Sequence, residues 1–375
     1  MPRQLVVCLD GTGNRFSAHA TNIVRLFRCL DHGPDVLAFY DQGVGTFGTR
    51  ETLFDWQNVP ARMLGLAFGW GIRRNVENAY RFLAEHLRDG DEIFLFGFSR
   101  GAFAVRALAA MIRAVGLLPP HQLHLFQHAW TLLLTRDHGK PDFALQARFK
   151  HVFARPTRIR FMGLFDTVKS VGWIYDPVIM PHTANNPIVE IVRHAVSIDE
   201  RRCFFRQHLW HPEPSERTDV REVWFAGVHS DVGGGYPDAQ SHLSRVTLRW
   251  MLAEAHRFGL RLRGEATRRQ LRPRRAIGPD ATGIAHEELR GAWRLAEWIP
   301  RNVLTGRPDG ERAWEIGRTR ARFIRPGILL HRSVVDRMAA MPGYRPGNLP
   351  ADHDVIDDHP DLLTLLPDSE ARRPG

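Results

Sequence analysis

Ser99 lies in the pattern GFSRG (97–101), which has the form G-x-S-x-G. A short apolar run typical of a strand, DEIFLFGF (91–98), precedes the serine, and a strongly helical run, GAFAVRALAAMIRAVG (101–116), follows it. A serine that attacks acyl groups is held in this strand–turn–helix setting, because small flanking residues let the strand and helix pack closely and expose the hydroxyl. We therefore predict Ser99 as a nucleophile. The alternative is a tight turn that happens to contain a serine.

A serine hydroxyl is a weak nucleophile until a base takes its proton, so a histidine must lie nearby. Of the 19 histidines, His229 stands out because it follows the apolar run EVWFAGV (222–228) and begins the glycine-rich loop HSDVGGGY (229–236). The carboxyl end of that strand would lie at the same edge of a parallel sheet as Ser99. His229 is the predicted base, and His194 is its rival.

The third member of such a site is a carboxylate that fixes the imidazole tautomer. Asp166 follows directly on a predicted strand, so it is expected at the same edge of the sheet. Asp199 and Asp231 are competitors, although the spacing of two residues between Asp231 and His229 tends to point their side chains apart. The chain order of serine, aspartate and histidine is that of the α/β-hydrolases. The alternative role for Asp166 is to cap the following turn.

An oxyanion formed during acyl transfer needs backbone N–H donors aimed at it. One donor is expected from Arg100, the residue after the nucleophile, and the second from Gly11 or Thr12 in the loop DGTGN (10–14). The glycines of this loop also suit a phosphate-binding loop, but the lysine of a Walker A motif is missing. Two aromatic residues beside the predicted nucleophile and histidine loop are candidate substrate contacts: Phe98 and Tyr236.

Neither a metal nor a cofactor is predicted. The three cysteines include no CxxC pair, which argues against a cysteine-rich zinc site. His121, His124 and His128 share one face of a predicted helix, but the first and last lie about 10 Å apart along the axis and do not converge on one ion.

Strands alternating with helices must position these residues, and this alternation predicts a parallel sheet flanked by helices. The fold class expected is α/β, of the α/β-hydrolase type, with helical cap insertions. Strands are predicted at 4–10, 35–41, 91–98, 157–166 and 221–228, and helices at 21–30, 67–87, 101–116 and 243–259.

The domain prediction is a catalytic core over residues 1–260 and an extension over 261–375 that packs on it. Residues 117–156 interrupt the alternation with a helical insertion rich in apolar residues. We predict that this insertion and part of 261–350 form an acyl-binding cap over Ser99. The segment 261–350 holds 19 arginines and 9 acidic residues, within a chain of 375 residues and net charge +10. An apolar pocket ringed by arginine would suit an ester with a fatty tail and an anionic head.

Five motifs together resemble one family, the α/β-hydrolases typified by the catalytic domain of type VI secretion phospholipase effectors. The resemblance covers about residues 4–260 and implies Ser99 as nucleophile, Asp166 as acid, His229 as base, and an esterase activity on acyl esters such as phospholipids. Two C-terminal segments, LLHRSVVDR (329–337) and YRPGNLP (344–350), are similar to the family's C-terminal part. The five motifs are LDGTGN (9–14), GVGT (43–46), LFGFSRGA (95–102), GLFDTV (163–168) and EVWFAGVHSDVGGGY (222–236).

The functional hypothesis is therefore a serine hydrolase of carboxylic esters, of lipase or phospholipase A type, that works through an acyl-enzyme. The alternatives are a non-catalytic protein with the same fold and a basic module that binds a membrane surface or nucleic acid. The expected partners are a small-molecule or lipid ester and, transiently, an anionic membrane surface; no nucleic acid is expected because no such motif is present. The sequence lacks a run of 18 apolar residues and a signal peptide, so we expect a cytoplasmic protein or one secreted without a signal peptide.

Overall fold

The computed structural model describes residues 2–11, 19–43, 61–137, 140–168, 172–173, 176–177, 180–211, 217–272, 279–304, 312–357 and 362–366. Within these residues, eight strands form one sheet in the order β14-β13-β10-β9-β6-β3-β1-β2, and every neighbouring pair is parallel. The strands are β1 (Gln4–Leu9), β2 (Val36–Asp41), β3 (Glu92–Phe98), β6 (Ile159–Phe165), β9 (Val189–Ser197), β10 (Asp219–Phe225), β13 (Ile328–His331) and β14 (His353–Ile356). The parallel α/β fold predicted from the sequence is confirmed.

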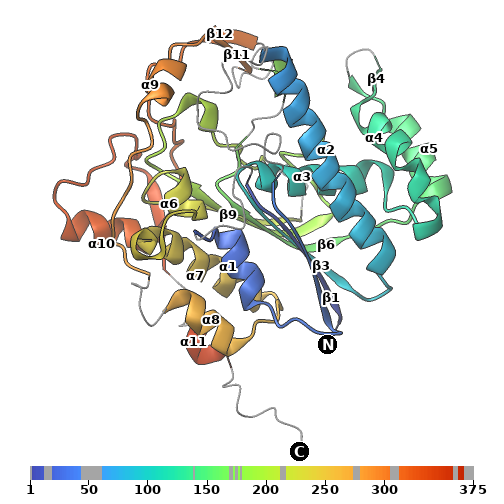
Figure 1. The fold of residues 1–375 in the computed structure, drawn as a ribbon, viewed down its shortest axis with the longest axis horizontal. Helices are drawn as coiled ribbons and strands as arrows, with labels where there is room; N and C mark the ends of the chain where they lie inside the picture. Colours follow the sequence, from blue (N-terminus) through green and yellow to red (C-terminus); the bar gives the residue numbers. More distant parts are fainter. Residues whose placement is uncertain are drawn as a thin grey trace, which may run out of the picture.

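Helices cover both faces of this sheet, because the side chains of each strand alternate between them. In β1, Leu5, Val7 and Leu9 pack into one core, and Val6 and Cys8 pack into the other. The first core is covered by α2 (Ala61–His86) and α3 (Arg100–Val115), and the second by α1 (Asn22–Cys29), α7 (His242–Arg257) and α8 (Gly264–Leu271) (Figure 1). Shorter elements are α6 (His229–Gly233), α9 (Ala292–Ala296), α10 (Arg332–Ala340), α11 (Leu362–Leu365), η3 (Cys203–Phe205), η4 (Asp238–Gln240), β7 (Gly172–Trp173), β8 (Asp176–Pro177), β11 (Arg301–Leu304) and β12 (Arg312–Glu315).

The order of the strands indicates where a ligand would bind. After β1 the chain places β2 on one side and β3 on the other, so the direction of winding reverses between β1 and β3. Ligands of open parallel sheets bind outside the carboxyl ends of the strands at such a switch point. Ser99 follows β3 directly and therefore lies at this switch point.

The helical insertion expected at 117–156 is present, but its described contacts lie far from Ser99. It consists of η2 (Pro120–Leu125), α4 (Phe126–Leu134), β4 (Arg136–Asp137), β5 (Lys140–Pro141) and α5 (Phe143–Phe153). Leu117 and Arg155 bridge to each other, and Lys150 Nζ donates to the carbonyl of Arg113, near the end of α3 opposite to Ser99. Phe126 is fully buried in the core rather than lining a cap. These contacts give no support to a cap formed by 117–156.

The C-terminal part of the chain completes the sheet. β13 pairs with β10 through Val223 opposite Leu329 and Trp224 opposite Leu330, and β14 pairs with β13. The boundary predicted at residue 260 therefore does not divide the sheet, because strands from beyond it belong to the same hydrogen-bonded layer. Sequence reasoning missed β9, which is nine residues long, and also β13 and β14, which are short at four residues each.

Candidate active site

Ser99 sits on a strained turn between β3 and α3. Its backbone has φ 58° and ψ −122°, and a positive φ is uncommon for a residue other than glycine. Two glycines make the turn possible: a Cβ on Gly101 would lie 2.2 Å from the carbonyl oxygen of Leu9, and one on Gly97 would lie 2.5 Å from the Cα of Ala102. Such strain is held where a side chain must be presented in one orientation, as in a nucleophile elbow.

Asp166 and His229 are brought into direct contact. His229 Nδ1 lies 2.6 Å from Asp166 Oδ2, and both side chains are buried. Asp166 follows β6, next to Ser99, whose N–H donates to the carbonyl of Phe165 over 3.0 Å. The backbone N–H of Ser197 donates to Asp166 Oδ1 over 2.9 Å. A carboxylate can only accept hydrogen bonds, so Nδ1 of His229 carries the proton and Nε2 has a free lone pair.

His229 begins α6, directly after β10 and its short turn, and its ring is held between two aromatic rings. The ring centroids of Phe98 and Phe205 lie 4.7 Å and 4.9 Å from that of His229. Phe98 immediately precedes Ser99, so the imidazole lies over the strand end that carries the serine. Within the described residues no hydrogen bond joins the Ser99 hydroxyl to His229. Such catalytic hydrogen bonds commonly shorten only when substrate binds.

Arg322 holds the same carboxylate from the other side. Its Nη1 lies 2.6 Å from Asp166 Oδ1 and its Nη2 lies 2.9 Å from Asp166 Oδ2, a bidentate ion pair in which both partners are buried. Burial would raise the pKa of Asp166, but the charge of Arg322 and the hydrogen bond from His229 outweigh it and hold that pKa well below its usual range. Asp166 is therefore ionised throughout the neutral range.

The loop after β1 lies against the start of α3, as an oxyanion-hole loop must. Asp10 holds this loop: its Oδ1 accepts the N–H of Gly11 over 2.7 Å, and its Oδ2 accepts the hydroxyl of Thr21 over 2.6 Å. The N–H of Gly11 is thus engaged by Asp10. Thr12 lies outside the described residues. Arg100 is the first residue of α3 and follows Ser99 directly.

The rival histidine and carboxylates serve other contacts. His194 Nε2 accepts the N–H of Thr167 over 3.0 Å and its Nδ1 lies 2.7 Å from Glu222, so both ring nitrogens are engaged. Asp199 accepts the N–H of Gly227 and the hydroxyl of Tyr344. Asp231 bonds His286 and the N–H of Val228. Of the three carboxylates weighed, only Asp166 contacts the His229 ring.

The two predicted substrate contacts are engaged inside the protein. Phe98 is buried, with its ring against the backbone of Gly233. The hydroxyl of Tyr236 donates to Glu288, which also pairs with Arg202. Their positions place Phe98 beneath the site and Tyr236 in a network that joins the histidine loop to the C-terminal part.

Three residues near the site were missed by sequence reasoning: Glu200, Phe205 and Arg322. Glu200 Oε2 accepts the backbone N–H of His229 over 3.2 Å, while Arg202 donates to both oxygens of the same carboxylate. No motif marks these positions, and Arg322 is one of many arginines in its segment. The one available signal was the short polar stretch that follows Ser197. It was not used, because the strand that ends at Ser197 was not predicted.

The Glu200 carboxylate gives the site a pH-dependent stability. Burial raises its pKa, but the hydrogen bond and charge of Arg202 outweigh this and lower it. The folded protein then binds this proton more weakly than the unfolded chain, so the stabilisation is full above about pH 4.3 and is lost as the pH falls through the lower folded pKa. We expect the thermal unfolding midpoint to drop less steeply between about pH 5 and pH 3 in Glu200→Gln than in the wild type. Equal slopes would contradict this.

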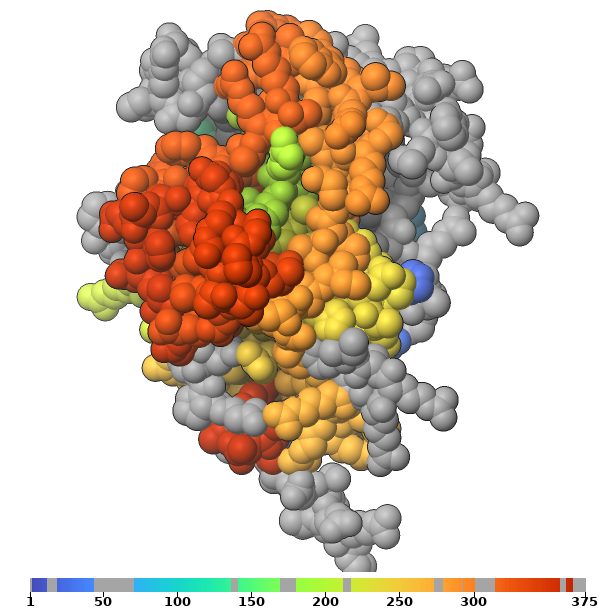
Figure 2. All heavy atoms as spheres, turned by 90° about the vertical axis from the view of Figure 1, so that its left-hand side faces the viewer, coloured from blue at the N-terminus to red at the C-terminus, as the bar shows by residue number. Residues whose placement is uncertain are grey.

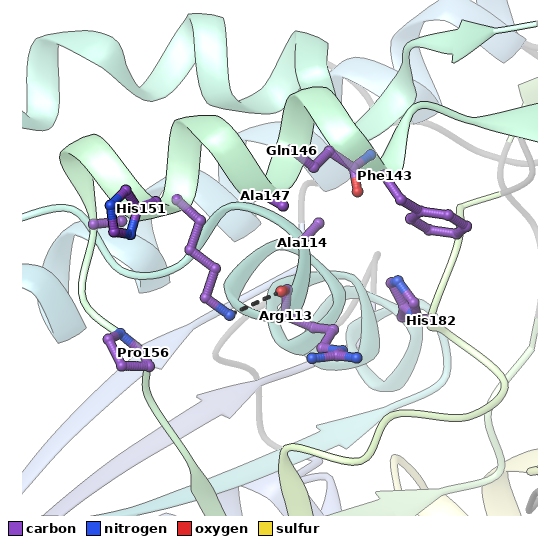
Figure 3. Close-up of a pocket in the computed structure, with 10 residues that line it drawn as sticks. Arg113, Ala114, Phe143, Gln146, Ala147, His151, Pro156 and His182 are labelled. Carbon is purple, nitrogen blue, oxygen red and sulfur yellow. Dashed lines mark hydrogen bonds between the residues drawn. The ribbon is translucent and has the colours of Figure 1, made fainter.

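The described pocket lies away from these residues. Its volume is about 670 Å³ and it opens between the end of α3 and α5, where Figure 3 shows His151 at one side and Phe143 with His182 at the other. Ser99 begins the other end of α3, about 20 Å away at 1.5 Å per residue.

His121, His124 and His128 are exposed, and among the described residues no group of three or more His, Cys, Asp or Glu side chains could hold a metal ion.

Comparison with known families identifies the chain. Residues 3–254 match the model of the catalytic domain of Tle1-like phospholipase effectors of the type VI secretion system. The chain belongs to this family. The matched range contains Ser99, Asp166 and His229. Arg322 and Glu288 lie beyond it.

Three individual proteins are also similar to this chain, each over part of its length. An uncharacterized protein of Saccharomyces cerevisiae is 28% identical over 70% of this chain and 58% of its own length, so this chain spans less than two thirds of that relative. An uncharacterized protein from Pseudomonas aeruginosa of known crystal structure is 20% identical, with 71% of this chain and 47% of that one covered and a TM-score of 0.43. A Tle1 effector of known structure, bound to the VgrG spike of the type VI secretion system, is 20% identical. The match covers 64% of this chain and 52% of that one, with a TM-score of 0.35.

None of the described helices combines the length and the apolar character needed to cross a membrane.

Proposed function

We propose that the protein is a serine hydrolase that cleaves carboxylic esters of lipids through an acyl-enzyme on Ser99. The observation that carries the proposal is the contact between His229 and Asp166 beside the strained Ser99 turn. Together these side chains offer the three groups that acyl transfer requires: a nucleophile, a base and a carboxylate.

The chemistry follows from the tautomer of His229. Its Nε2 takes the proton of the Ser99 hydroxyl while Oγ bonds to the ester carbonyl carbon, and the carbonyl oxygen becomes an oxyanion. The N–H of Arg100 and a donor from the loop at Thr12 stabilise that oxyanion. When the intermediate collapses, the C–O bond to the alcohol breaks and His229 gives the alcohol its proton. Water, deprotonated by His229, then attacks the acyl-enzyme, and the carboxylic acid leaves with Ser99 restored.

A lipid substrate is supported by the surface beside the site. Four large apolar side chains are exposed there, and we call them the apolar rim: Leu295 (76%), Trp298 (62%), Trp314 (61%) and Phe323 (74%). The elements that carry the rim contact η3 and the residue stretch after it, because Trp293 of α9 packs edge-on against Phe205 and the carbonyl of Phe323 accepts from Gln207. Figure 2 shows the green surface near residue 200 flanked by orange and red surface of the C-terminal part. Exposed tryptophans suit the interface of a lipid aggregate with water.

We expect the double variant Trp298→Ser/Phe323→Ser to hydrolyse phospholipid vesicles about thirtyfold more slowly, because each exposed aromatic side chain adds about 1 kcal/mol of interfacial binding. Hydrolysis of a soluble short-chain ester should stay within about twofold, since neither side chain contacts the triad. The matched control is Phe143→Ser, which removes an exposed aromatic from α5 and should leave both rates unchanged. An equal loss on both substrates would contradict a role of the rim at an interface.

The test of the function is labelling of Ser99 by a fluorophosphonate, followed by a panel of acyl chains and headgroups. Attachment of the probe to Ser99, located by mass spectrometry of the peptide, supports the proposal. Absence of labelling in a folded protein would reject it.

A further inference from the structure

We propose that Arg322, from the C-terminal part of the chain, is a positioning residue that acts through Asp166 to orient and activate His229. This inference rests on the proposed function. It assigns a role to a region beyond the family match, which ends at residue 254.

The guanidinium of Arg322 also donates to two residues that flank Asp166, Ser197 and Phe205. Besides its two bonds to Asp166, Nη1 lies 2.7 Å from Ser197 Oγ and 3.2 Å from the Ser197 carbonyl, and Nη2 donates to the carbonyl of Phe205. Arg322 thereby ties the end of β9 and η3 to Asp166. Phe205 is also one of the two rings that hold the imidazole of His229. One side chain thus fixes both the carboxylate and the wall beside the base.

The segment that carries Arg322 is itself fastened to the ends of the strands. Asn348 Nδ2 donates to the carbonyls of Arg322 and Ile198, over 3.0 Å and 3.1 Å. Tyr344 donates its hydroxyl to Asp199 over 2.9 Å. Tyr344 and Asn348 belong to the YRPGNLP segment, to which sequence analysis gave no role. These contacts give the segment a role, because they hold Arg322 in the position in which it pairs with Asp166.

The bidentate geometry has a chemical consequence. Asp166 is fully buried, and burial favours the neutral acid. A protonated Asp166 could no longer accept at both oxygens, and the proton on Nδ1 of His229 would lose its partner. The guanidinium keeps the carboxylate charged and in the plane that faces His229.

Other charged groups face this pair and stay in place when Arg322 is changed. Glu200 lies at the backbone of His229 and is paired with Arg202, and His194 lies behind Asp166 through Thr167. Loss of Arg322 therefore leaves a larger fraction of Asp166 protonated at a given pH, and the Nδ1 proton of His229 then loses its acceptor.

The experiment measures the rate constant for fluorophosphonate labelling of Ser99 in the full chain from about pH 5 to pH 9, corrected for the folded fraction by circular dichroism. For Arg322→Gln we expect a loss of about a hundredfold at pH 7 and a shift of the acid limb of the profile to higher pH by about one unit, as expected for loss of a charge in direct contact. Arg322→Lys should restore the position of the limb, because it restores the charge. The matched control is Arg245→Gln: Arg245 is equally buried, but it bonds Asp238 and the carbonyl of Gln270, and its removal should leave the profile unshifted.

A double-variant comparison separates positioning from mere support of the fold. In the Asp166→Asn background, Arg322→Gln should cost less than about threefold, because the residue acts through that carboxylate. An equal loss in both backgrounds, or an unshifted limb in Arg322→Gln, would overturn the proposal. If Arg322→Gln does not fold, Arg322→Met is measured in both backgrounds, and the losses in the two backgrounds are compared in the same way.

Failure of the proposed function is distinguishable from failure of this inference. If folded wild-type protein is not labelled at Ser99, the hydrolase proposal falls. The role of Arg322 is then decided by proton NMR of the Nδ1 proton of His229, which Asp166 holds. We expect its low-field resonance to persist to lower pH in the wild type and in Arg322→Lys than in Arg322→Gln. An unchanged resonance in Arg322→Gln would overturn the role of Arg322 independently of activity.

Discussion

Ser99→Ala should abolish ester hydrolysis while leaving the fold intact. The hydroxyl is the atom that bonds to the acyl carbon, and other serine hydrolases lose on the order of 10⁶ in turnover when their nucleophile is removed. We expect a loss of at least about a thousandfold, with residual activity limited to what the oxyanion donors and substrate binding supply. The measurement is the rate on a soluble ester together with fluorophosphonate labelling, which should disappear.

The control for Ser99→Ala is a fold measurement on the same variant. Alanine fits the turn sterically, although it retains the strain of the positive φ at this position. Circular dichroism and the thermal midpoint should therefore stay close to those of the wild type. A variant that keeps more than about a tenth of wild-type activity would show that another group is the nucleophile, because catalysis without it is expected to fall by far more than tenfold.

The local order of strands and helices could be predicted from the sequence because each element carries its own signal. The apolar run of β3, the helical period of α3 and the glycines between them predict the Ser99 turn within a single segment. The same holds for the strands that end before Asp166 and near His229. Parallel pairing then brings their carboxyl ends to one edge, which is why residues far apart in the chain could be placed together.

What could not be predicted depends on pairings between distant segments. β13 is only four residues long, and its pairing with β10 is set by contacts across about a hundred residues of chain. Arg322 looks like any other arginine of its segment until the fold places it on Asp166. The insertion at 117–156 was misplaced for a related reason. Its apolar residues indicate burial but do not say against which surface, and Phe126 packs into the main core rather than over Ser99.

Asp166→Asn should cost on the order of 10⁴ in turnover, by analogy with the same change in other triads. An asparagine amide can present its NH₂ to Nδ1, which would favour the tautomer with the proton on Nε2 and remove the lone pair that must take the Ser99 proton. Asp199→Asn and Asp231→Asn are the comparisons, because both carboxylates lie close in the chain to the site but neither contacts the ring of His229. They should retain activity within about tenfold, with losses that follow stability rather than chemistry.

The presence of Arg322 makes the Asp166→Asn result more informative than in an ordinary triad. The variant leaves a buried guanidinium opposite a neutral amide, so we expect it to be destabilised as well, by about 3 kcal/mol or more. Removing the guanidinium in the double variant Asp166→Asn/Arg322→Met should recover part of that stability without recovering turnover, because the carboxylate is still missing. Stability and activity would then separate within one pair of residues. If Asp166→Asn stays active while Asp199→Asn or Asp231→Asn is inactive, the wrong carboxylate has been assigned, and the ion pair with Arg322 is structural alone.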